Sequence, residues 1–267
     1  MLNHLKENLP RPMVRLVRDG RDFFKRMPEL PAAYFHPWRR ASMHAIANFK
    51  DQYLGKRCFI IGNGPSLRQT DLKKLKNEYT FGMNRIYLAF PEMGFPTTFF
   101  VSINDLVIQQ TAADIQKMEM PKFIAWRSHQ WLQPGENLFF LYTTYTEPVF
   151  AKNAAGRLWE GATVTYTALQ LAYYMGFSEV ILIGVDHSFA TKGKPNETVT
   201  SSGDDPNHFN PAYFGKGFRW QLPDLETSEM AYRMAKQAFK SDGRRVLDAT
   251  IGGKLTVFPK MDYGKLF

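Results

Sequence analysis

The chain has 267 residues, of which 44% are hydrophobic and 22% charged, a globular balance that excludes extended disorder. It has no run of 18 or more apolar residues, which excludes a transmembrane helix, and its start lacks the apolar segment and cleavage site of a secretion signal. The single cysteine, Cys58, cannot form an internal disulfide, so a cytoplasmic location is expected.

Residues 1–54 are predicted to form a basic helical arm. The net charge is +9, and the first 50 residues hold ten lysines and arginines against four acidic residues, an excess of +6. Between about Arg11 and Met27, apolar positions recur at steps of three and four, which favours an amphipathic helix. The prolines expected to break it are Pro28, Pro31 and Pro37. A second helix is expected over about 39–53. The arm either binds an anionic surface, with the protein peripheral at the inner face of the membrane, or is a solvated basic face.

From residue 55 onward, apolar strands alternate with helices. The predicted strands are 58–61, 79–83, 98–103, 122–126, 138–142, 179–183 and 245–247, and the predicted helices are 71–76, 105–118, 163–175 and 227–241. Several strands are continuous apolar runs, as expected where helices cover both faces of a parallel sheet. The predicted fold class is therefore α/β, with a Rossmann-like, mostly parallel sheet, and residues 55–267 are predicted to form one nucleotide-binding catalytic domain.

The stretch from Lys192 to Asp205 has a different composition. It is rich in Gly, Pro, Ser, Thr and Asn and has few apolar residues, so it is predicted to be a long flexible loop. Because it follows the strand that leads to Asp186, we expect it to act as a lid over the site.

The first predicted strand ends in a distinctive turn. The turn reads Gly62, Asn63, Gly64, Pro65, Ser66 and Leu67. Ligands of open α/β sheets bind beyond the carboxyl ends of strands, and glycines let a phosphate or ribose approach the backbone. Because Asn63 and Ser66 add side-chain hydrogen bonds, residues 62–66 are predicted to bind a nucleotide, with an ordinary tight turn as the alternative. The pattern is neither the dinucleotide-binding Gly-x-Gly-x-x-Gly nor a P-loop.

Four further polar residues follow predicted strands or begin a helix. They are Asn84, Asp105, Thr163 and Thr165. Asn84 is expected at the same sheet edge as Asn63, and the two threonines begin a helix whose free N–H groups favour an anion. All four are predicted to bind the nucleotide, although each is also a residue type that ends a strand or caps a helix.

Two candidate catalytic residues follow the strand 179–183. Asp186 lies near its carboxyl end, where a carboxylate can bind a sugar hydroxyl or orient a base. His208 lies beyond the expected lid, and an imidazole exchanges protons near neutral pH. Nearby Tyr213 is predicted to hydrogen-bond a phosphate leaving group. The alternatives are that Asp186 is satisfied locally and that His208 is simply exposed. The sequence has no zinc-binding spacing of Cys and His, so no metal site is predicted.

The turn carries a resemblance to known families. Ile61 to Leu67 resembles the opening motif of bacterial sialyltransferases that use a cytidine-monophosphate sugar, and of a broader family that includes archaeal 6-hydroxymethylpterin pyrophosphokinases. Further similarities lie at Met83-Asn84-Arg85, at Ala162-Thr163-Val164-Thr165, along Phe177–Asp186 and at His208-Phe209. The resemblance spans about 57–250. The chain departs from the sialyltransferases at 163–165, where they have Thr-Ser-Gly, and in a shorter stretch between 186 and 208.

The resemblance implies a glycosyltransferase that moves a sugar from a nucleotide-sugar to a glycan or lipid-linked acceptor. His208 would deprotonate the acceptor hydroxyl, and Thr163 with Tyr213 would stabilise the leaving phosphate. No cofactor beyond the donor and no nucleic-acid partner are expected. One alternative is an ATP- and Mg²⁺-dependent pyrophosphokinase acting on a pterin, with metal-directing carboxylates at Asp105, Asp186 and Asp204. The other is a non-catalytic nucleotide-binding protein at a membrane.

Overall fold

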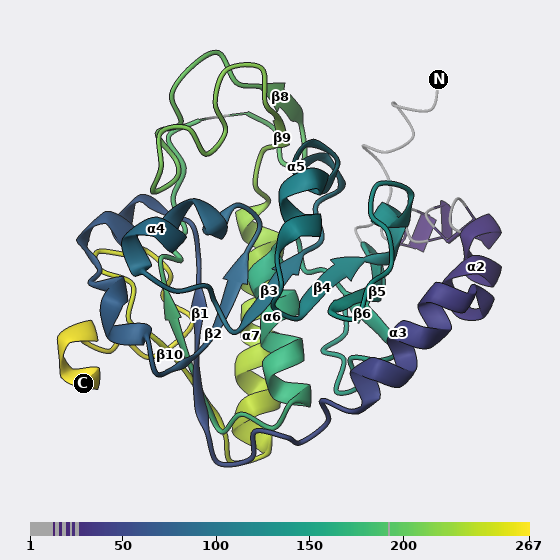
Figure 1. Cartoon of the computed structure of the whole chain (residues 1–267), viewed down its shortest axis with the longest axis horizontal. Coiled ribbons are helices and arrows are strands. Elements are labelled where there is room, and N and C mark those ends of the chain that lie inside the picture. Colours follow the sequence, from purple (N-terminus) through teal and green to yellow (C-terminus); the bar gives the residue numbers. More distant parts are fainter. Residues whose placement is uncertain (1–12, 14–15, 18–19, 22, 25–26, 192) are drawn as a thin grey trace.

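The described part of the chain is built around one parallel sheet of eight strands. A computed structural model describes all residues except 1–12, 14–15, 18–19, 22, 25–26 and 192 (Figure 1). The strands are β1 (Arg57–Ile61), β2 (Tyr79–Met83), β3 (Phe99–Ser102), β4 (Lys122–Ala125), β5 (Leu138–Thr144), β6 (Arg157–Trp159), β7 (Glu179–Ile183) and β10 (Arg245–Asp248). Their order is β10-β7-β1-β2-β3-β4-β5-β6, and every neighbouring pair is parallel. The predicted α/β, Rossmann-like fold class is confirmed.

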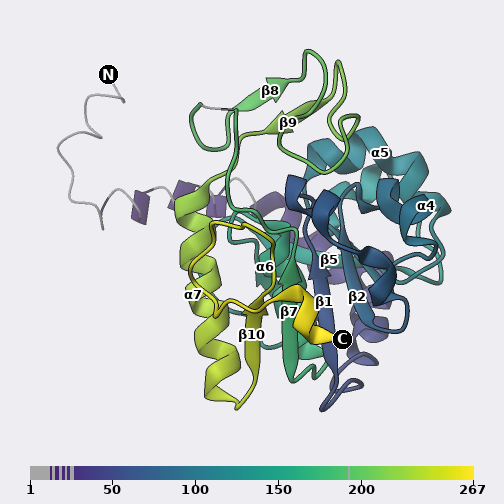
Figure 2. The ribbon, with the colours of Figure 1, turned by 90° about the vertical axis from the view of Figure 1, so that its left-hand side faces the viewer.

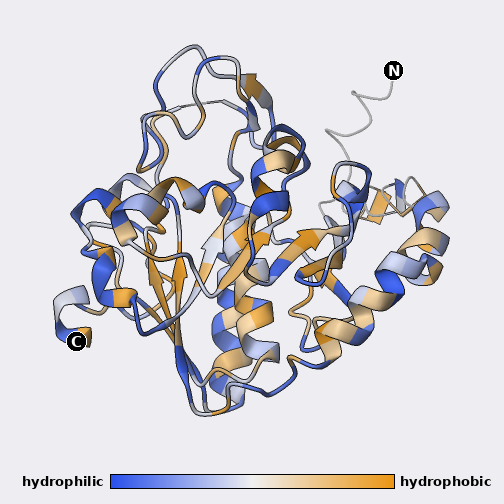
Figure 3. Cartoon of the chain, in the orientation of Figure 1, coloured by the Kyte–Doolittle hydropathy of each residue, from blue (hydrophilic) through white to orange (hydrophobic). Residues whose placement is uncertain are grey.

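Helices cover both faces of this sheet. They are α2 (Leu30–Phe35), α3 (Pro37–Ala47), α4 (Phe90–Met93), α5 (Asp105–Lys117), α6 (Val164–Tyr174) and α7 (Leu225–Ser241). Residues of α6 and α7 share one apolar cluster with Cys58 and Ile60, whereas residues of α5 share a second cluster with Phe59 and Ile61. Because alternate strand residues point to opposite faces, β1 is buried on both sides. Figure 2 shows the two helical layers, and Figure 3 shows the apolar strands between them.

Several connections are short 3-10 helices. They are η1 (Met27–Glu29), η2 (Pro65–Gln69), η3 (Leu72–Leu75), η4 (Ile86–Ala89), η5 (Trp126–Gln130) and η6 (Tyr263–Leu266). The helix predicted over 71–76 is the 3-10 helix η3 rather than an α-helix. Pro31 is the second residue of α2 and Pro37 the first residue of α3, so both lie in the first turn of a helix that follows the segment they were expected to end. A proline fits there because the first helical N–H groups have no partner within the helix.

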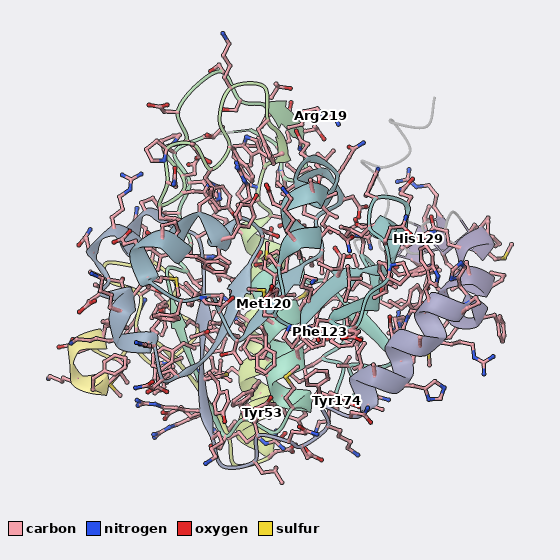
Figure 4. The ribbon with its side chains drawn as sticks, viewed as in Figure 1. Tyr53, Met120, Phe123, His129, Tyr174 and Arg219 are labelled. Atoms are coloured by element: carbon pink, nitrogen blue, oxygen red, sulfur yellow. The ribbon has the colours of Figure 1, made fainter. Side chains whose placement is uncertain are left out.

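A two-stranded antiparallel hairpin lies beyond the carboxyl ends of the parallel strands (Figure 1). It pairs β8 (Thr198–Thr200) with β9 (Arg219–Gln221). The N–H of Asn196 also donates to Leu222 O at 2.9 Å, which extends the pairing. Within the stretch 192–205 that was predicted to be a loop, residues 198–200 form a strand instead, and the prediction was wrong for that part. Figure 4 shows Arg219 of this hairpin at the opposite end of the molecule from Tyr53 and Tyr174.

Helix α3, which belongs to the predicted arm, packs on β5. The N–H of Phe140 donates to Ser42 Oγ at 2.9 Å, and Arg39 Nη2 donates to Ala155 O at 2.7 Å. Burial lowers the pKa of Arg39 to about 10. The amphipathic helix predicted over about 11–27 falls mainly on residues outside the described ones. Among the described helices, none combines the length and the apolar character needed to cross a membrane.

Candidate functional site

A cavity of about 840 Å³ runs along the carboxyl edge of the sheet. Its wall includes residues just after seven strands: Gly62 (β1), Asn84 (β2), Ile103 (β3), Arg127 (β4), Tyr145 (β5), Glu160 (β6) and Gly184 (β7). The chain starts the sheet at β1, adds β2 to β6 on one side, and then returns to place β7 on the other side. The order of strands thus reverses between β1 and β7, which is the position where open α/β sheets bind ligands.

Gly62 and Gly64 allow the ends of β1 and β7 to touch. The N–H of Gly62 donates to Ile183 O at 2.7 Å, and the N–H of Gly64 donates to Gly184 O at 2.9 Å. A Cβ on Gly62 would lie only 2.2 Å from Gly184 O, so no side chain fits there. The glycines therefore serve a contact between two strand ends, a role that the sequence analysis did not foresee.

Asp186 fastens the same turn from the side of β7. Ser66 donates to its carboxylate from the backbone N–H at 3.1 Å and from Oγ at 2.6 Å. A Cβ on Gly64 would lie 1.9 Å from Asp186 Oδ2. Asp186 lines the cavity, but both of its oxygens accept hydrogen bonds from Ser66. Its carboxylate therefore holds the turn in place.

The two predicted asparagines lie on the cavity wall with different hydrogen bonds. Asn63 Nδ2 donates to Met83 O at 3.0 Å, while its Oδ1 is buried and has no partner among the described residues. Asn84 has a left-handed backbone, with φ of 52°, and its Oδ1 accepts from Ser102 Oγ at 2.9 Å. A buried oxygen without a donor is unusual in a folded protein. Asn63 Oδ1 is thus an acceptor that a ligand hydroxyl or amino group would satisfy.

The start of α6 also opens on the cavity, where Thr163 and Thr165 line the wall. Thr163 is the N-cap residue, since its Oγ1 accepts from the N–H of Thr165 at 3.3 Å. The same Oγ1 lies 3.3 Å from the hydroxyl of Tyr232, whose pKa is raised by burial. Thr163 therefore caps the helix, which is one of the two roles that the sequence suggested for it. An anion would be favoured at this end of the helix.

His208 is oriented by a buried carboxylate. Its Nδ1 lies 2.7 Å from Asp205 Oδ2, and the Asp205 side chain is only 3% exposed. An ionised carboxylate only accepts hydrogen bonds, so Nδ1 carries the proton and the other ring nitrogen, Nε2, is left as an acceptor. The imidazole stacks on the ring of Tyr213, with centroids 4.0 Å apart and planes 9° apart. His208 lies on the cavity wall with its orientation fixed, as a general base requires.

Two arginines tie the loop of His208 to the strand ends. Arg68 donates to His208 O at 2.9 Å and to Phe209 O at 2.8 Å. Arg85 donates to Ala212 O at 2.9 Å, and its backbone N–H donates to the hydroxyl of Tyr213. Burial raises the pKa of Tyr213. The loop and the turn after β1 thus form one connected unit.

Asp105 lies outside the cavity lining. Its Oδ2 accepts from Arg127 Nε at 3.0 Å and its Oδ1 from Ser128 Oγ at 3.1 Å. It does not cap α5, because Asn104 Oδ1 accepts the N–H of Val107 at 3.2 Å. Arg127 also donates from Nη1 to Glu160 Oε1 at 2.7 Å. Both Arg127 and Glu160 line the cavity, and the sequence analysis named neither.

Most of the predicted site residues meet in this one cavity. Those on its wall are Gly62, Asn63, Gly64, Asn84, Thr163, Thr165, Asp186, His208 and Tyr213, and those outside its lining are Pro65, Ser66 and Asp105. Arg127 follows a predicted strand, so the rule that placed Asn84 would have found it. Glu160 follows β6, which was not predicted. Within the described residues, no group of three or more His, Cys, Asp or Glu side chains is arranged to hold a metal ion.

Known proteins resemble this chain in sequence and in fold. A family model described as "6-hydroxymethylpterin diphosphokinase MptE-like" matches residues 37–192, more than half of the chain. The fold is similar to that of the MAf glycosyltransferase from Magnetospirillum magneticum AMB-1, with a TM-score of 0.51 and 14% sequence identity. This similarity covers 86% of the present chain but only 39% of the glycosyltransferase. No curated protein sequence matches the chain.

Proposed function

Because this chain belongs to the 6-hydroxymethylpterin diphosphokinase MptE-like family, we propose that it is a nucleotide-dependent transferase, and specifically a glycosyltransferase. It would move a sugar from a nucleotide-sugar donor to a hydroxyl of a glycan or lipid-linked acceptor. The observation that carries the proposal is the pair His208 and Asp205 on the cavity wall, because sugar transfer to a hydroxyl needs a positioned base. The similar fold of a protein named as a glycosyltransferase, and the likeness of the turn to sialyltransferases, support it.

The nucleotide is placed over the ends of β1, β2 and β7. Asn63 Oδ1 would accept a hydrogen bond from the ribose or base, and Asn84 would add its side-chain amide. Asp186 and Ser66 would act on the nucleotide through the turn that they hold together. The start of α6 at Thr163 would face the phosphate, since helix N-termini favour anions.

The reaction is a direct displacement at the anomeric carbon of the donor. His208 Nε2 takes the proton of the acceptor hydroxyl as the acceptor oxygen bonds to that carbon. The bond between the carbon and the phosphate oxygen breaks, and its electron pair leaves with the nucleotide. The imidazolium formed at His208 is stabilised by Asp205, as in other imidazole–carboxylate pairs. Tyr213 lies beneath the imidazole and keeps the ring in this position.

The pyrophosphokinase alternative comes from the description of the family. It would use Asp105, Asp186 and Asp204 as metal-directing carboxylates. Both oxygens of Asp105 accept hydrogen bonds, from Arg127 and from Ser128, and both oxygens of Asp186 accept from Ser66. For these two carboxylates the hydrogen bonds favour sugar transfer, in which neither has to bind a metal.

A nucleotide screen separates these candidates. The melting temperature of the protein is measured with cytidine, uridine, guanosine and adenosine nucleotides, each with and without Mg²⁺, because a bound ligand stabilises the fold by mass action. Sugar transfer predicts that a cytidine or uridine nucleotide raises the melting temperature without metal. Stabilisation by ATP alone, and only with Mg²⁺, would overturn the proposal in favour of the kinase. A nucleotide that binds without hydrolysis or transfer of its sugar would favour a non-catalytic binding protein.

A further inference from the structure

The cavity extends well beyond the strand ends to which the nucleotide is assigned. Its floor is formed at the ends of seven neighbouring strands, from β7 to β6. At the usual spacing between strands, such a floor is about 29 Å long. The nucleotide residues Asn63 and Asn84 follow β1 and β2, whereas Arg127, Tyr145 and Glu160 follow β4, β5 and β6. The end of the cavity formed by these last three residues is here called the distal end.

Arg127 at the distal end uses four of its five N–H groups in bonds within the protein. Its Nε donates to Asp105, its Nη1 to Glu160 and to Thr143 Oγ1 at 2.9 Å, and its Nη2 to Ile103 O at 3.2 Å. Burial alone would lower its pKa, but the carboxylates of Glu160 and Asp105 outweigh burial and raise it. Two acidic partners therefore neutralise this guanidinium, and the wall around it is acidic rather than basic.

Whereas Arg127 has only donors, Glu160 offers the cavity a hydrogen-bond acceptor. Its side chain is only 7% exposed, yet the residue lines the cavity. Its Oε1 accepts from Arg127 at 2.7 Å. A carboxylate on a cavity wall can also accept a charge-assisted hydrogen bond from a ligand hydroxyl. An anionic ligand group at the same position would be repelled.

Aromatic rings complete the distal end. Trp159 and Tyr145 both line the cavity, and Trp159 Nε1 donates to Tyr145 O at 3.0 Å. The guanidinium of Arg127 lies 4.5 Å from the centroid of the Tyr145 ring, which fixes that ring against the wall. A carboxylate beside aromatic rings suits a ligand with hydroxyl groups at its edge and an apolar face.

We propose that the distal end is the acceptor subsite and that Glu160 selects an uncharged, hydroxyl-rich ring by accepting hydrogen bonds from its hydroxyl groups. This proposal rests on the proposed function, since it gives the second half of the cavity to the second substrate of a sugar transfer. It assigns Glu160 to acceptor specificity. Because the loop of His208 is tied to the turn after β1, the acceptor must extend from the distal end toward the nucleotide half, where its reacting hydroxyl meets His208.

The test measures the binding of three probes by calorimetry to protein saturated with the nucleotide found in the screen. The probes are p-nitrophenyl β-glucoside, p-nitrophenyl β-galactoside and p-nitrophenyl β-glucuronide, the last of which replaces the hydroxymethyl group of the glucoside by a carboxylate. We expect at least one neutral glycoside to bind, and the glucuronide to bind at least about tenfold more weakly than the glucoside, because Glu160 repels its charge.

Glu160→Gln removes the charge but keeps an oxygen that can accept from Arg127, so the fold is expected to survive. It should weaken the neutral glycoside by about tenfold or more, the usual size of losing a hydrogen bond to a charged group. The substitution should also reduce the difference in affinity between the glucoside and the glucuronide. Glu147→Gln is the matched control, because Glu147 is also paired with an arginine, Arg157, but is exposed and lies outside the lining. It should change neither affinity.

Three outcomes would overturn the acceptor subsite. These are a glucuronide that binds as tightly as the glucoside, a Glu160→Gln variant with wild-type affinities, and a folded, nucleotide-bound protein to which no neutral glycoside binds. In each case the nucleotide affinity of wild type and of Glu160→Gln is measured alongside. If the nucleotide still binds, only the subsite proposal fails. If no nucleotide binds to the wild-type protein, the proposed function itself fails.

Discussion

At the scale of single residues, His208 turns its Nδ1 to Asp205, which leaves Nε2 to act as the proposed base. His208→Ala removes the base and is expected to lower kcat by about 10²–10⁴-fold, the usual range for a positioned acid–base group. Nucleotide affinity, measured by calorimetry, should change little.

His187 is the natural comparison for this substitution. It also lines the cavity, but its Nε2 contacts Glu229 Oε1 at 3.2 Å. His187→Ala should therefore have the smaller effect on kcat. If kcat of the His208→Ala protein is within a few-fold of the wild-type value, another residue must act as the base. Equal losses of rate and of nucleotide affinity would show that His208 only supports the fold of the site.

At the scale of elements, the turn after β1 and the end of β7 depend on each other. Gly64 has φ of −69° and ψ of 163°, a conformation open to any residue, so only the nearby Asp186 carboxylate excludes a side chain. Gly64→Ala is expected to cost about 1–3 kcal/mol of unfolding free energy, typical of overpacking. In an Asp186→Ala background the same change should cost clearly less, because the Cβ of residue 186, 3.0 Å away, is then the nearest atom. Urea unfolding of the four proteins measures this coupling, and an equal cost in both backgrounds would contradict it.

The sequence was informative for elements with strong local patterns. The seven predicted strands are present within two residues of their expected ends, because a continuous apolar run marks a strand buried on both faces. The strands β6, β8 and β9 have three residues each and were missed, since so short a stretch has no readable period. Short strands depend on their partners, and the partner of β8 lies about twenty residues away.

The same distinction explains the candidate site. Residues such as Asn63 and Asn84 could be predicted because they follow readable strands, and parallel strands end at one edge. The contact of Asp205 with His208 and that of Arg127 with Glu160 are set by loop conformation, which has no periodic signal. Asp186 was expected to act on substrate, but its partner Ser66 shows how a polar residue at a strand end can also hold a neighbouring turn.

At the scale of the whole molecule, the basic N-terminal segment is proposed to hold the protein at an anionic membrane, where lipid-linked acceptors lie. The exposed large apolar residues among those described between 11 and 27 are Met13, Leu16, Val17, Phe23, Phe24 and Met27. Sedimentation with anionic vesicles should be strong at low salt and weak at high salt, because screening removes the attraction of the basic residues. Sedimentation with neutral vesicles is the control. Equal and negligible binding to both kinds of vesicle would contradict membrane binding and indicate that the segment is an ordinary solvated surface.

Nearly all of the residues that line the cavity come from two parts of the chain, one inside the span that matches the family and one after it. The family match ends at residue 192, after the last strand end of the cavity floor. Asp205, His208 and the hairpin of β8 and β9 lie in the stretch that follows. On the proposed assignment, the residues that bind the nucleotide lie almost entirely within the matched span, whereas the proposed base His208 lies after it. Membership of the family therefore does not by itself extend to the proposed reaction.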